Sequence, residues 1–596
     1  MKLSNIFKKS LILGVSALML CSCEDFLTIY PTDKTVLEDY WKTKEDVDMM
    51  TTGAYKAMIA TAIQKRAIIW GAYRSDELNL LSSNTNTNLR NISAMNLLGT
   101  NEWCSWGAFY TVINDCNLVL KHAPEVVELD PEFTSGDYDV VRSQMLALRS
   151  LCYFYLVRAF RDVPYNKEAY ENDTQELYYG QTAPDSILQC CINDLEEAVN
   201  ISISTGGYGT SSWKNTGFIT TDAINTILAD IYLWRASLTH STADYQKCVE
   251  YCDKVIDAKD ALYTSQMSSA AVGVTTKEDK YHLYDGTMEY LFNFARGNSR
   301  ESILEWQYDG NNNVNEAVRD FYYSTSSTDA HGMLMASKIF GGTPSSNANE
   351  SGGSTIHFST NDYRYWTYVY ESTDGDATEF DIRKMCASTS DASVTSNITT
   401  AYKRNLGRIY KTFDQNWIVY RLTDVMLMKA EALVQIASND EDQNTLKSAF
   451  DLVQVVNKRS MKSTATDTLK FVNYSTKEAL ELLVLAERER ELCFEGKRWF
   501  DLVRFSYRHM DTSKLDFSKT LYQLNEEGHS FANVYNVMVD FVVRKYETGG
   551  NVVSYKLKTE PYLYFPIQES QIDINPLLHQ NPVYTLNEST SRVSDD

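Results

Sequence analysis

The chain has 596 residues, a formal net charge of −23 and a hydrophobic content of 43%. So acidic a chain lacks the basic surface that binds nucleic-acid phosphates or anionic lipid headgroups, and both kinds of partner are disfavoured. The apolar share is ordinary for a globular protein with a sizeable core, and the length favours several domains. Aromatic residues make up 12% of the chain, and 39 of them are tyrosines.

The N-terminus has the pattern of a leader sequence. A lysine-containing head precedes ten mostly apolar residues at 11–20. That run is too short to cross a bilayer, which needs about 20 residues, and fits the core of a signal peptide. The following Leu-Cys-Ser-Cys resembles a bacterial lipoprotein box, so we expect cleavage after residue 22 and lipidation of Cys23. The alternative is a plain secretory signal with incidental cysteines.

Helical periodicity is strong in both outer parts of the chain. Apolar residues recur at spacings of three and four in three segments: 142–160, 220–238 and 417–437. A further helix is expected over 475–496, opened by a capping box of Ser475 and Glu478 and closed by Gly496. Alanines inside these stripes let helices approach closely. The pattern predicts a mainly α fold, a tetratricopeptide-like scaffold of helical pairs.

The middle of the chain differs in composition. From about 265 to 415 it is rich in Ser, Thr, Asn and Gly, with aromatic clusters at 321–323 and 363–370. Long loops are usually functional or disordered, and the aromatic content disfavours simple disorder. We therefore expect an irregular, loop-rich lobe on the helical scaffold. The expected regions are a signal peptide at 1–22, an N-terminal helical region at 23–264, a ligand-binding lobe at 265–415 and a C-terminal helical region at 416–596.

Sequence motifs for catalysis are missing. The chain contains no zinc-protease, hydrolase-elbow, P-loop or dinucleotide motif, and its cysteines outside the leader have no zinc-ligand spacing. The sequence therefore predicts no enzyme and no cofactor. One alternative is structural calcium, because "DGNNNVNEAVRD" at 309–320 partly resembles a calcium loop. Val314 stands there in place of the glycine that such a loop requires.

A dense motif near the C-terminus identifies a family. "ERERELCFEGKRWFDLVRF" at 487–505 resembles the signature of the SusD/RagB family of nutrient-binding outer-membrane lipoproteins. Four other segments agree with that family in order: 23–31, 160–165, 420–433 and 565–584. Two residues, Arg161 and Val583, replace glycines that are common in the family.

The charges of this motif have two interpretations. Glu487, Arg488, Glu491, Arg498, Asp501 and Arg504 could be mistaken for an acid–base site. Because opposite charges alternate beside large aromatic residues, we interpret them as a buried ion-pair network that locks helices together. The ligand contacts of the family are then expected in variable loops.

The resemblance implies a SusD-like protein, anchored by lipid to the outer membrane at the cell surface. Such a protein captures oligosaccharides and delivers them to a TonB-dependent SusC-like transporter. Exposed aromatic rings suit the apolar faces of sugars, so we predict ligand contacts from residues in or beside polar loops: Arg74, Trp103, Tyr308, Phe321, Tyr322, Tyr365 and Trp366. Burial of each in the lobe's own core is the alternative, and Trp106 is assigned to the core because helical spacing follows it.

Three other functions are open at this point. A RagB-like protein for peptide uptake would also use exposed aromatics. A surface glycoside hydrolase would need two carboxylates in one cleft, roughly 5 to 9.5 Å apart. A purely structural surface protein would bind neither a glycan nor a transporter.

Overall fold

The computed structural model describes ten segments of the chain: 40–172, 174–209, 211–266, 280–322, 332–340, 358–359, 361–371, 380–385, 414–465 and 468–585. The predicted signal peptide and the lipidation site Cys23 lie outside these residues, as do most of the polar stretches between 265 and 415 and the side chain of Trp366.

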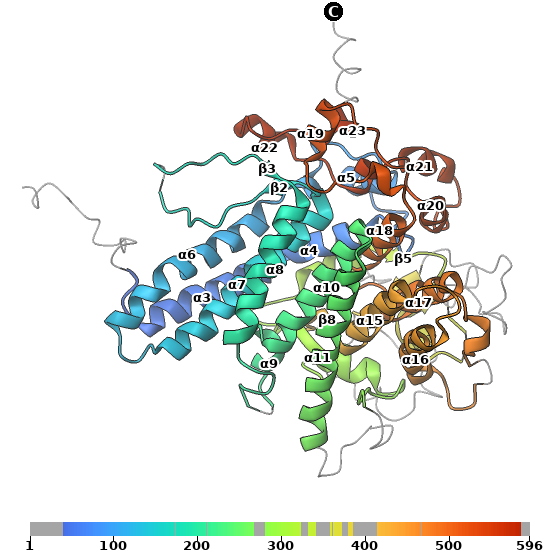
Figure 1. Ribbon diagram of the computed structural model, residues 1–596, viewed down its shortest axis with the longest axis horizontal. Helices are drawn as coiled ribbons and strands as arrows, with labels where there is room; N and C mark the ends of the chain where they lie inside the picture. The colour runs from blue at the N-terminus through green and yellow to red at the C-terminus, as the bar shows by residue number, and fades with distance from the viewer. Residues whose placement is uncertain are drawn as a thin grey trace, which may run out of the picture.

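The first half of the chain is a row of long helices that pack side by side (Figure 1). These helices are α3 (Lys44–Met58), α6 (Gly107–Leu129), α7 (Ser135–Phe160), α8 (Pro184–Ile201), α10 (Thr221–Thr239) and α11 (Thr242–Gln266). Each of them packs against the next in this order. Shorter elements between them are α4 (Thr61–Ile68), the π-helix η1 (Ile69–Tyr73), α5 (Thr87–Ser93), η2 (Glu102–Cys104) and α9 (Lys214–Gly217).

The second half continues the row, because α11 packs against α15 (Figure 1). Its main helices are α15 (Leu422–Ile436), α16 (Gln443–Ser460), α17 (Lys477–Leu492) and α18 (Arg498–Arg508). Shorter helices follow: η5 (Phe471–Asn473), η6 (Thr512–Lys514), α19 (Leu521–Glu526), α20 (Asn536–Val543), α21 (Gly550–Lys556), η7 (Glu560–Leu563), α22 (Glu569–Ile574) and α23 (Pro582–Thr585). The predicted scaffold of helical pairs is confirmed.

Short antiparallel strands connect the middle of the chain to both helical regions. The largest sheet has the order β1-β5-β7-β6, with β1 (Leu78–Leu80), β5 (Leu334–Ala336), β7 (Phe380–Ile382) and β6 (Val369–Glu371). Two further pairs are β2 (Val163–Pro164) with β3 (Gln181–Thr182), and β4 (Ser302–Trp306) with β8 (Trp417–Arg421). The same region contains η3 (Tyr290–Arg296), α12 (Glu316–Tyr322) and α13 (Tyr363–Thr367). The domain boundaries stay a prediction, although β4 and β5 tie the middle region closely to its neighbours.

Three local predictions were wrong. The helix expected from residue 417 begins at Leu422, because "WIVYR" forms β8 and pairs with β4. Aromatic and β-branched residues favour a strand once a partner is available. The N-cap of α17 is Thr476, whose hydroxyl accepts a hydrogen bond from the backbone N–H of Ala479 at 3.3 Å, and not Ser475. The helix also ends at Leu492, before the predicted end at Gly496, and Gly496 forms part of the turn that follows, with a positive φ of 72°.

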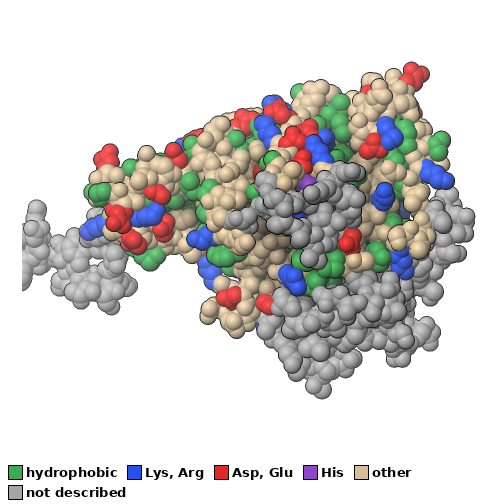
Figure 2. Space-filling model, turned by 90° about the horizontal axis from the view of Figure 1, so that it is seen from below, with side chains coloured by type: hydrophobic (Ala, Val, Ile, Leu, Met, Phe, Trp, Pro, Cys, Tyr) green, Lys and Arg blue, Asp and Glu red, His purple; other side chains and the backbone are tan. Residues whose placement is uncertain are grey.

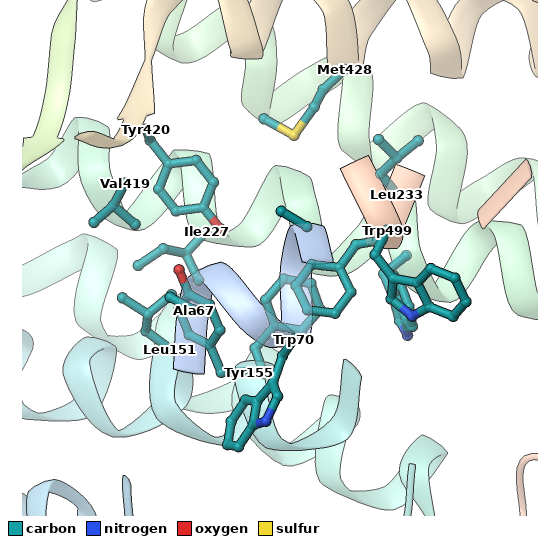
Figure 3. Close-up of a cluster of buried hydrophobic side chains, with 14 of the residues drawn as sticks. Ala67, Trp70, Leu151, Tyr155, Ile227, Leu233, Val419, Tyr420, Met428 and Trp499 are labelled. Atoms are coloured by element: carbon teal, nitrogen blue, oxygen red, sulfur yellow. The ribbon is translucent and has the colours of Figure 1, made fainter. Parts of the chain in front are cut away.

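The core lies where the two halves meet (Figure 3). Trp70 from η1, Tyr155 from α7, Tyr420 from β8 and Trp499 from α18 are all buried there. The backbones also come very close, since a Cβ added to Gly71 would lie 1.8 Å from the carbonyl oxygen of Gly496. Only glycine fits this contact, which holds the π-helix against the turn between α17 and α18.

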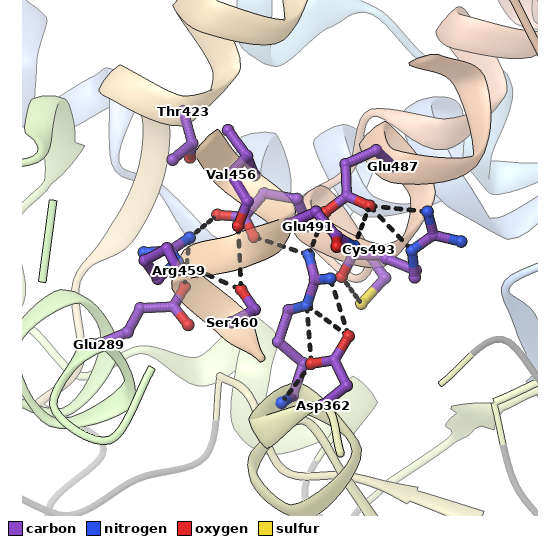
Figure 4. Close-up of polar contacts among 12 residues, drawn as sticks. Glu289, Asp362, Thr423, Val456, Arg459, Ser460, Glu487, Glu491 and Cys493 are labelled. Carbon is purple, nitrogen blue, oxygen red and sulfur yellow. Dashed lines mark hydrogen bonds and ion pairs between the residues drawn. The ribbon is translucent and has the colours of Figure 1, made fainter. Parts of the chain in front are cut away.

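The predicted ion-pair network is confirmed beside this core (Figure 4). The Glu491 carboxylate accepts hydrogen bonds from Arg364 at 3.0 Å, from Arg421 at 2.5 Å and from Arg459. Arg364 also donates to Glu487 at 2.8 Å. Burial alone would raise the pKa of Glu491, but the three guanidinium groups hold it well below its usual range.

The rest of the motif pairs in the same way. Arg488 bridges Asp424 at 3.0 Å and Asp501 at 2.9 Å. Arg504 pairs with Asp501 at 2.7 Å and with Glu431 at 2.8 Å. Arg498 reaches back across the chain to Asp76 at 2.9 Å. Charged residues that are adjacent in sequence thus bind partners on several different elements.

One departure from the family pattern has a structural explanation. Arg161 ends α7 with a positive φ of 67°, a conformation that costs an ordinary residue roughly 1–3 kcal/mol. Its buried guanidinium pairs with Glu560 at 2.9 Å and with Asp162 at 2.8 Å. It also donates to the backbone oxygens of Asp516 at 2.6 Å and Lys519 at 2.9 Å, and these contacts offset the strain.

The outer surface carries charges of both signs. Figure 2 shows acidic and basic side chains gathered at the narrow end of the molecule. Lys44 of α3 and Asp137 of α7 pair at 3.2 Å, and both are partly exposed. Within the described residues, we find no helix with the length and apolarity needed to cross a bilayer.

Replacing Glu491 by Gln tests the network. The change keeps the side-chain volume but leaves three buried guanidinium groups short of one negative charge. We expect the free energy of unfolding, measured by urea denaturation, to fall by about 3–5 kcal/mol. The control is Glu197→Gln, which removes a partly exposed ion pair with Arg142 and should cost less than about 1 kcal/mol. Equal costs at the two positions would contradict the role given to the network.

Candidate functional site

The structure places five of the seven predicted ligand residues inside the protein. Arg74, Phe321, Tyr322 and Tyr365 are at most 3% exposed, and Trp103 is 7% exposed. The expectation that these side chains form an exposed platform is therefore wrong. The polar character of the flanking loops does not show whether an aromatic residue within them points outward, and here these residues pack into the core.

Arg74 has a structural role at the end of η1. Its guanidinium donates to the backbone oxygens of Leu563 and Tyr562 and lies 4.1 Å from the ring centre of Trp499. Burial lowers the pKa of Arg74 to about 10. Since all these partners belong to the protein, this arginine joins the two halves of the chain.

Two of the predicted aromatic residues contact each other. Trp103 and Phe321 are in edge-to-face contact, with their ring centres 5.6 Å apart. The Tyr322 hydroxyl donates to the backbone oxygen of Phe494 at 3.2 Å. Tyr308 is partly buried, and its hydroxyl lies within hydrogen-bond distance of the Gln64 side-chain oxygen at 2.8 Å and of the Ile59 backbone oxygen at 3.0 Å. Trp366 lies on α13, and its side chain is outside the described residues.

An open groove lies elsewhere, between the first half of α6, the loop joining β2 to β3, and the segment around α22. Its volume is about 600 Å³. In Figure 1 the β2–β3 loop extends alongside α6, and α22 lies near its base. Six aromatic residues line the groove: Trp106, Tyr110, Tyr153, Tyr170, Tyr178 and Tyr179. Five amide side chains do so as well: Asn114, Asn117, Asn166, Gln571 and Asn575.

Helix α6 presents one face to the groove and anchors the loop from it. The Asn114 amide pairs with the backbone of Tyr170, accepting from its N–H at 2.7 Å and donating to its carbonyl at 3.2 Å. One turn later, Asn117 donates to the carbonyl of Glu168 at 3.2 Å. The Tyr110 hydroxyl donates to the carbonyl of Pro164 at 2.6 Å. These bonds replace the strand pairing that the loop lacks.

The C-terminal segment closes the other side of the groove. Asn575 donates to the carbonyl of Tyr179 at 3.0 Å, and Gln181 exchanges two hydrogen bonds with the backbone of His579. The rim remains open to solvent, since Tyr178 is 39% exposed and Ile574 is 63% exposed. The walls are therefore held in place while several apolar and aromatic groups stay accessible.

A second, smaller cavity of about 170 Å³ lies on another part of the scaffold. It is lined by Tyr55, Phe218 and Trp306 among others, and Trp213 at its edge is 48% exposed. It offers room for at most a small group beside one exposed ring.

The calcium alternative finds no support in the geometry of its loop. One carboxylate oxygen of Asp309 accepts the backbone N–H groups of Asn311, Asn312 and Asn313, so this side chain caps its own turn. Asp320 at the far end pairs with Lys65 at 2.7 Å. Across the described parts of the chain, no three His, Cys, Asp or Glu side chains gather as metal ligands would.

The local sequence pattern did not predict the groove. Trp106 was assigned to the core, and it is indeed 4% exposed, yet one part of it forms the groove wall. The stretch 165–180 between β2 and β3, "YNKEAYENDTQELYYG", contains four tyrosines. A loop of that length is often functional, and this was the signal available in the sequence.

The fold and the groove together define a mainly helical scaffold that carries an open aromatic site. The family model described as the SusD family matches residues 288–584. A model described as "Starch-binding associating with outer membrane" matches residues 25–208. The chain belongs to the SusD family.

Individual relatives agree with this assignment. SusD-like protein P38 of Formosa agariphila is 25% identical over 526 residues, which cover 84% of this chain and 92% of the relative. The crystal structure of a SusD superfamily protein from Parabacteroides distasonis matches with a TM-score of 0.60 and 22% identity, covering 90% of this chain and 98% of that one. Another from Bacteroides thetaiotaomicron has a TM-score of 0.63 and 16% identity, covering 91% and 100%. These structures share the fold.

Asn114→Ala tests whether α6 anchors the loop. Loss of both hydrogen bonds to Tyr170 should increase amide hydrogen exchange at residues 166–179 by about tenfold, since local opening becomes easier. Exchange in α7 should stay unchanged. Asn193→Ala, at an exposed position of α8 where the side chain accepts a hydrogen bond from Gln189, is the control. Unchanged exchange in the loop would show that other contacts hold it.

Proposed function

We propose that the protein is a cell-surface lipoprotein that captures oligosaccharides in the α6 groove and passes them to a TonB-dependent SusC-like transporter. The observation that carries this proposal is the open groove itself, with tyrosine rings and amide groups on rigid walls. Membership of the SusD family supports it. So does the description of the matching model, which names starch binding and association with the outer membrane.

The chemistry of the groove suits sugars. A sugar ring has an apolar C–H face and a polar rim, so it can stack on Tyr178 while its hydroxyls bond to amides such as Gln571. Burying one ring face removes little apolar area from water, at about 25 cal/mol per Å². After the costs of association, affinities in the micromolar to millimolar range are expected. Such weak binding allows the ligand to be passed on.

The proposed function also requires anchoring at the membrane and transfer of the ligand to the transporter. Acyl chains on Cys23 would hold the mature chain at the outer membrane, since each buried CH₂ contributes about 0.8 kcal/mol. The described helices provide no membrane span of their own. Oligosaccharide held at an open rim remains accessible to a transporter that lies against the same face.

We propose binding without catalysis. Two alternative functions would use the same groove. One is uptake of peptides, whose side chains also stack on tyrosine. The other is hydrolysis of glycans by carboxylates in the groove. Incubating the purified protein with glycans separates these functions. Intact polymer with retarded migration in a gel supports the binder, shortened products support the hydrolase, and peptide binding without glycan binding supports the RagB-like alternative.

Tyr178→Ala tests the location of the site. Removing a 39% exposed ring from the groove should weaken the binding of an oligosaccharide identified in a glycan panel by about tenfold in isothermal titration calorimetry. Thermal stability should change little because the ring is not part of the core.

Two control variants, one at a tyrosine and one at a tryptophan, show whether the loss of affinity is specific to the groove. Tyr555 is 69% exposed on α21, away from the groove, and Tyr555→Ala should leave the affinity unchanged. Trp213→Ala removes the exposed ring of the smaller cavity. If that variant loses binding and Tyr178→Ala does not, the ligand occupies the smaller cavity and the proposal for the α6 groove fails.

A further inference from the structure

Among the described residues that line the α6 groove, the charged ones are all acidic. Asp115 on α6 and Glu168 and Glu176 on the β2–β3 loop contribute carboxylates, and the described residues that line the groove include no Lys or Arg. Within the described part of the chain, none of the three carboxylates forms an ion pair. This contrasts with Glu487 and Glu491 of the scaffold, whose buried carboxylates pair with arginine.

Three cationic groups around the groove are bound to other acids. Lys167 of the loop pairs with Asp194 of α8 at 2.9 Å. Lys121, one helical turn beyond Asn117 on α6, pairs with Glu171. Arg149 lies behind Asn117, is buried, and pairs with Asp194 at 2.6 Å. Since Lys167 and Arg149 share the single carboxylate of Asp194, these groups leave at most one positive charge against the three groove carboxylates.

The excess of negative charge in the groove should have its strongest effect at Asp115. The side chain is only partly exposed, and burial raises the pKa of its carboxyl group. A negative charge in a partly desolvated wall attracts a cation more strongly than the same charge in open water, and it repels an anion in the same measure. A ligand that carries ammonium groups would supply the positive charge that the described lining of the groove lacks.

We propose that the α6 groove selects oligosaccharides with protonated amines, such as glucosamine units, over neutral ones and still more strongly over those with uronate or sulfate groups. This inference rests on the proposed glycan-binding function and adds the ligand's charge class to it. The tyrosine rings stack on the sugar faces, and Asp115, Glu168 and Glu176 accept hydrogen bonds from the ammonium groups. The hydrogen bonds from Asn114 and Asn117 hold the backbone of the loop that carries the two glutamates against α6.

The test compares oligomers of equal length made of glucosamine, N-acetylglucosamine or galacturonic acid. Titration calorimetry with the full mature chain is done at low salt and mildly acidic pH, where the glucosamine amines are protonated. We expect glucosamine oligomers to bind about tenfold more tightly than the N-acetylated ones, and galacturonic acid oligomers to bind most weakly. Because exposed charges are screened, added salt should reduce the difference.

A charge-neutral variant shows whether the groove causes the preference. The double variant Asp115→Asn, Glu176→Gln keeps the shape of both side chains and should remove most of the advantage of glucosamine without weakening N-acetylglucosamine binding. Glu132→Gln, an exposed position near the start of α7 and outside the groove lining, is the matched control and should leave the advantage intact.

The outcomes separate this inference from the proposed function. If a neutral or acidic glycan binds as tightly as the amine-bearing oligomer at low salt, or if the double variant keeps the preference, the charge selection is wrong while glycan binding stands. If no glycan of a broad panel binds, the proposed function itself fails. Binding of lysine-rich peptides without any glycan would overturn both.

Discussion

The structure depends on the burial of the alternating glutamates and arginines of residues 487–504. Charges buried in this way are costly unless each finds a partner with good geometry. Their partners lie on distant elements, including Asp76 beside β1, Asp424 on α15 and Arg459 on α16. One arrangement of these elements satisfies the whole set, so the network fixes how the two halves of the chain meet. Direct contact between the Gly71 and Gly496 backbones reinforces that arrangement.

Because the scaffold is rigid, the groove can be open to solvent while its walls keep their positions. The α6 helix is packed between α3 and α7, and from this fixed position Asn114 and Asn117 hold the β2–β3 loop through its backbone. In the scaffold, Glu487 and Glu491 pair with arginine. For the groove carboxylates no ion pair is found within the described residues, and we propose that a ligand is their partner. We therefore infer different roles for these two carboxylates of the scaffold and those of the groove, because the former have a protein cation as a partner and the latter, within the described part of the chain, do not.

The sequence predicted what local pattern and charge determine. The long helices followed from apolar spacing, and the ion-pair network followed from opposite charges that alternate beside Trp499. Features that need a distant partner were predicted less well. "WIVYR" forms a strand because "SILEW" lies beside it, and Arg74 is buried because Trp499 and the backbone at 562–563 surround it. The groove was missed for the same reason, since its walls come from around 106–117, 164–179 and 571–578, and only the fold brings these together.

The central claim is that glycan binds between α6, the β2–β3 loop and the α22 segment. A crystal structure of the mature protein with a bound oligosaccharide tests it most directly. The account predicts electron density for sugar rings against Tyr178 and the neighbouring amides, with the helical scaffold unchanged. Density for the sugar at the Trp213 cavity, or over another face with the groove empty, would contradict it.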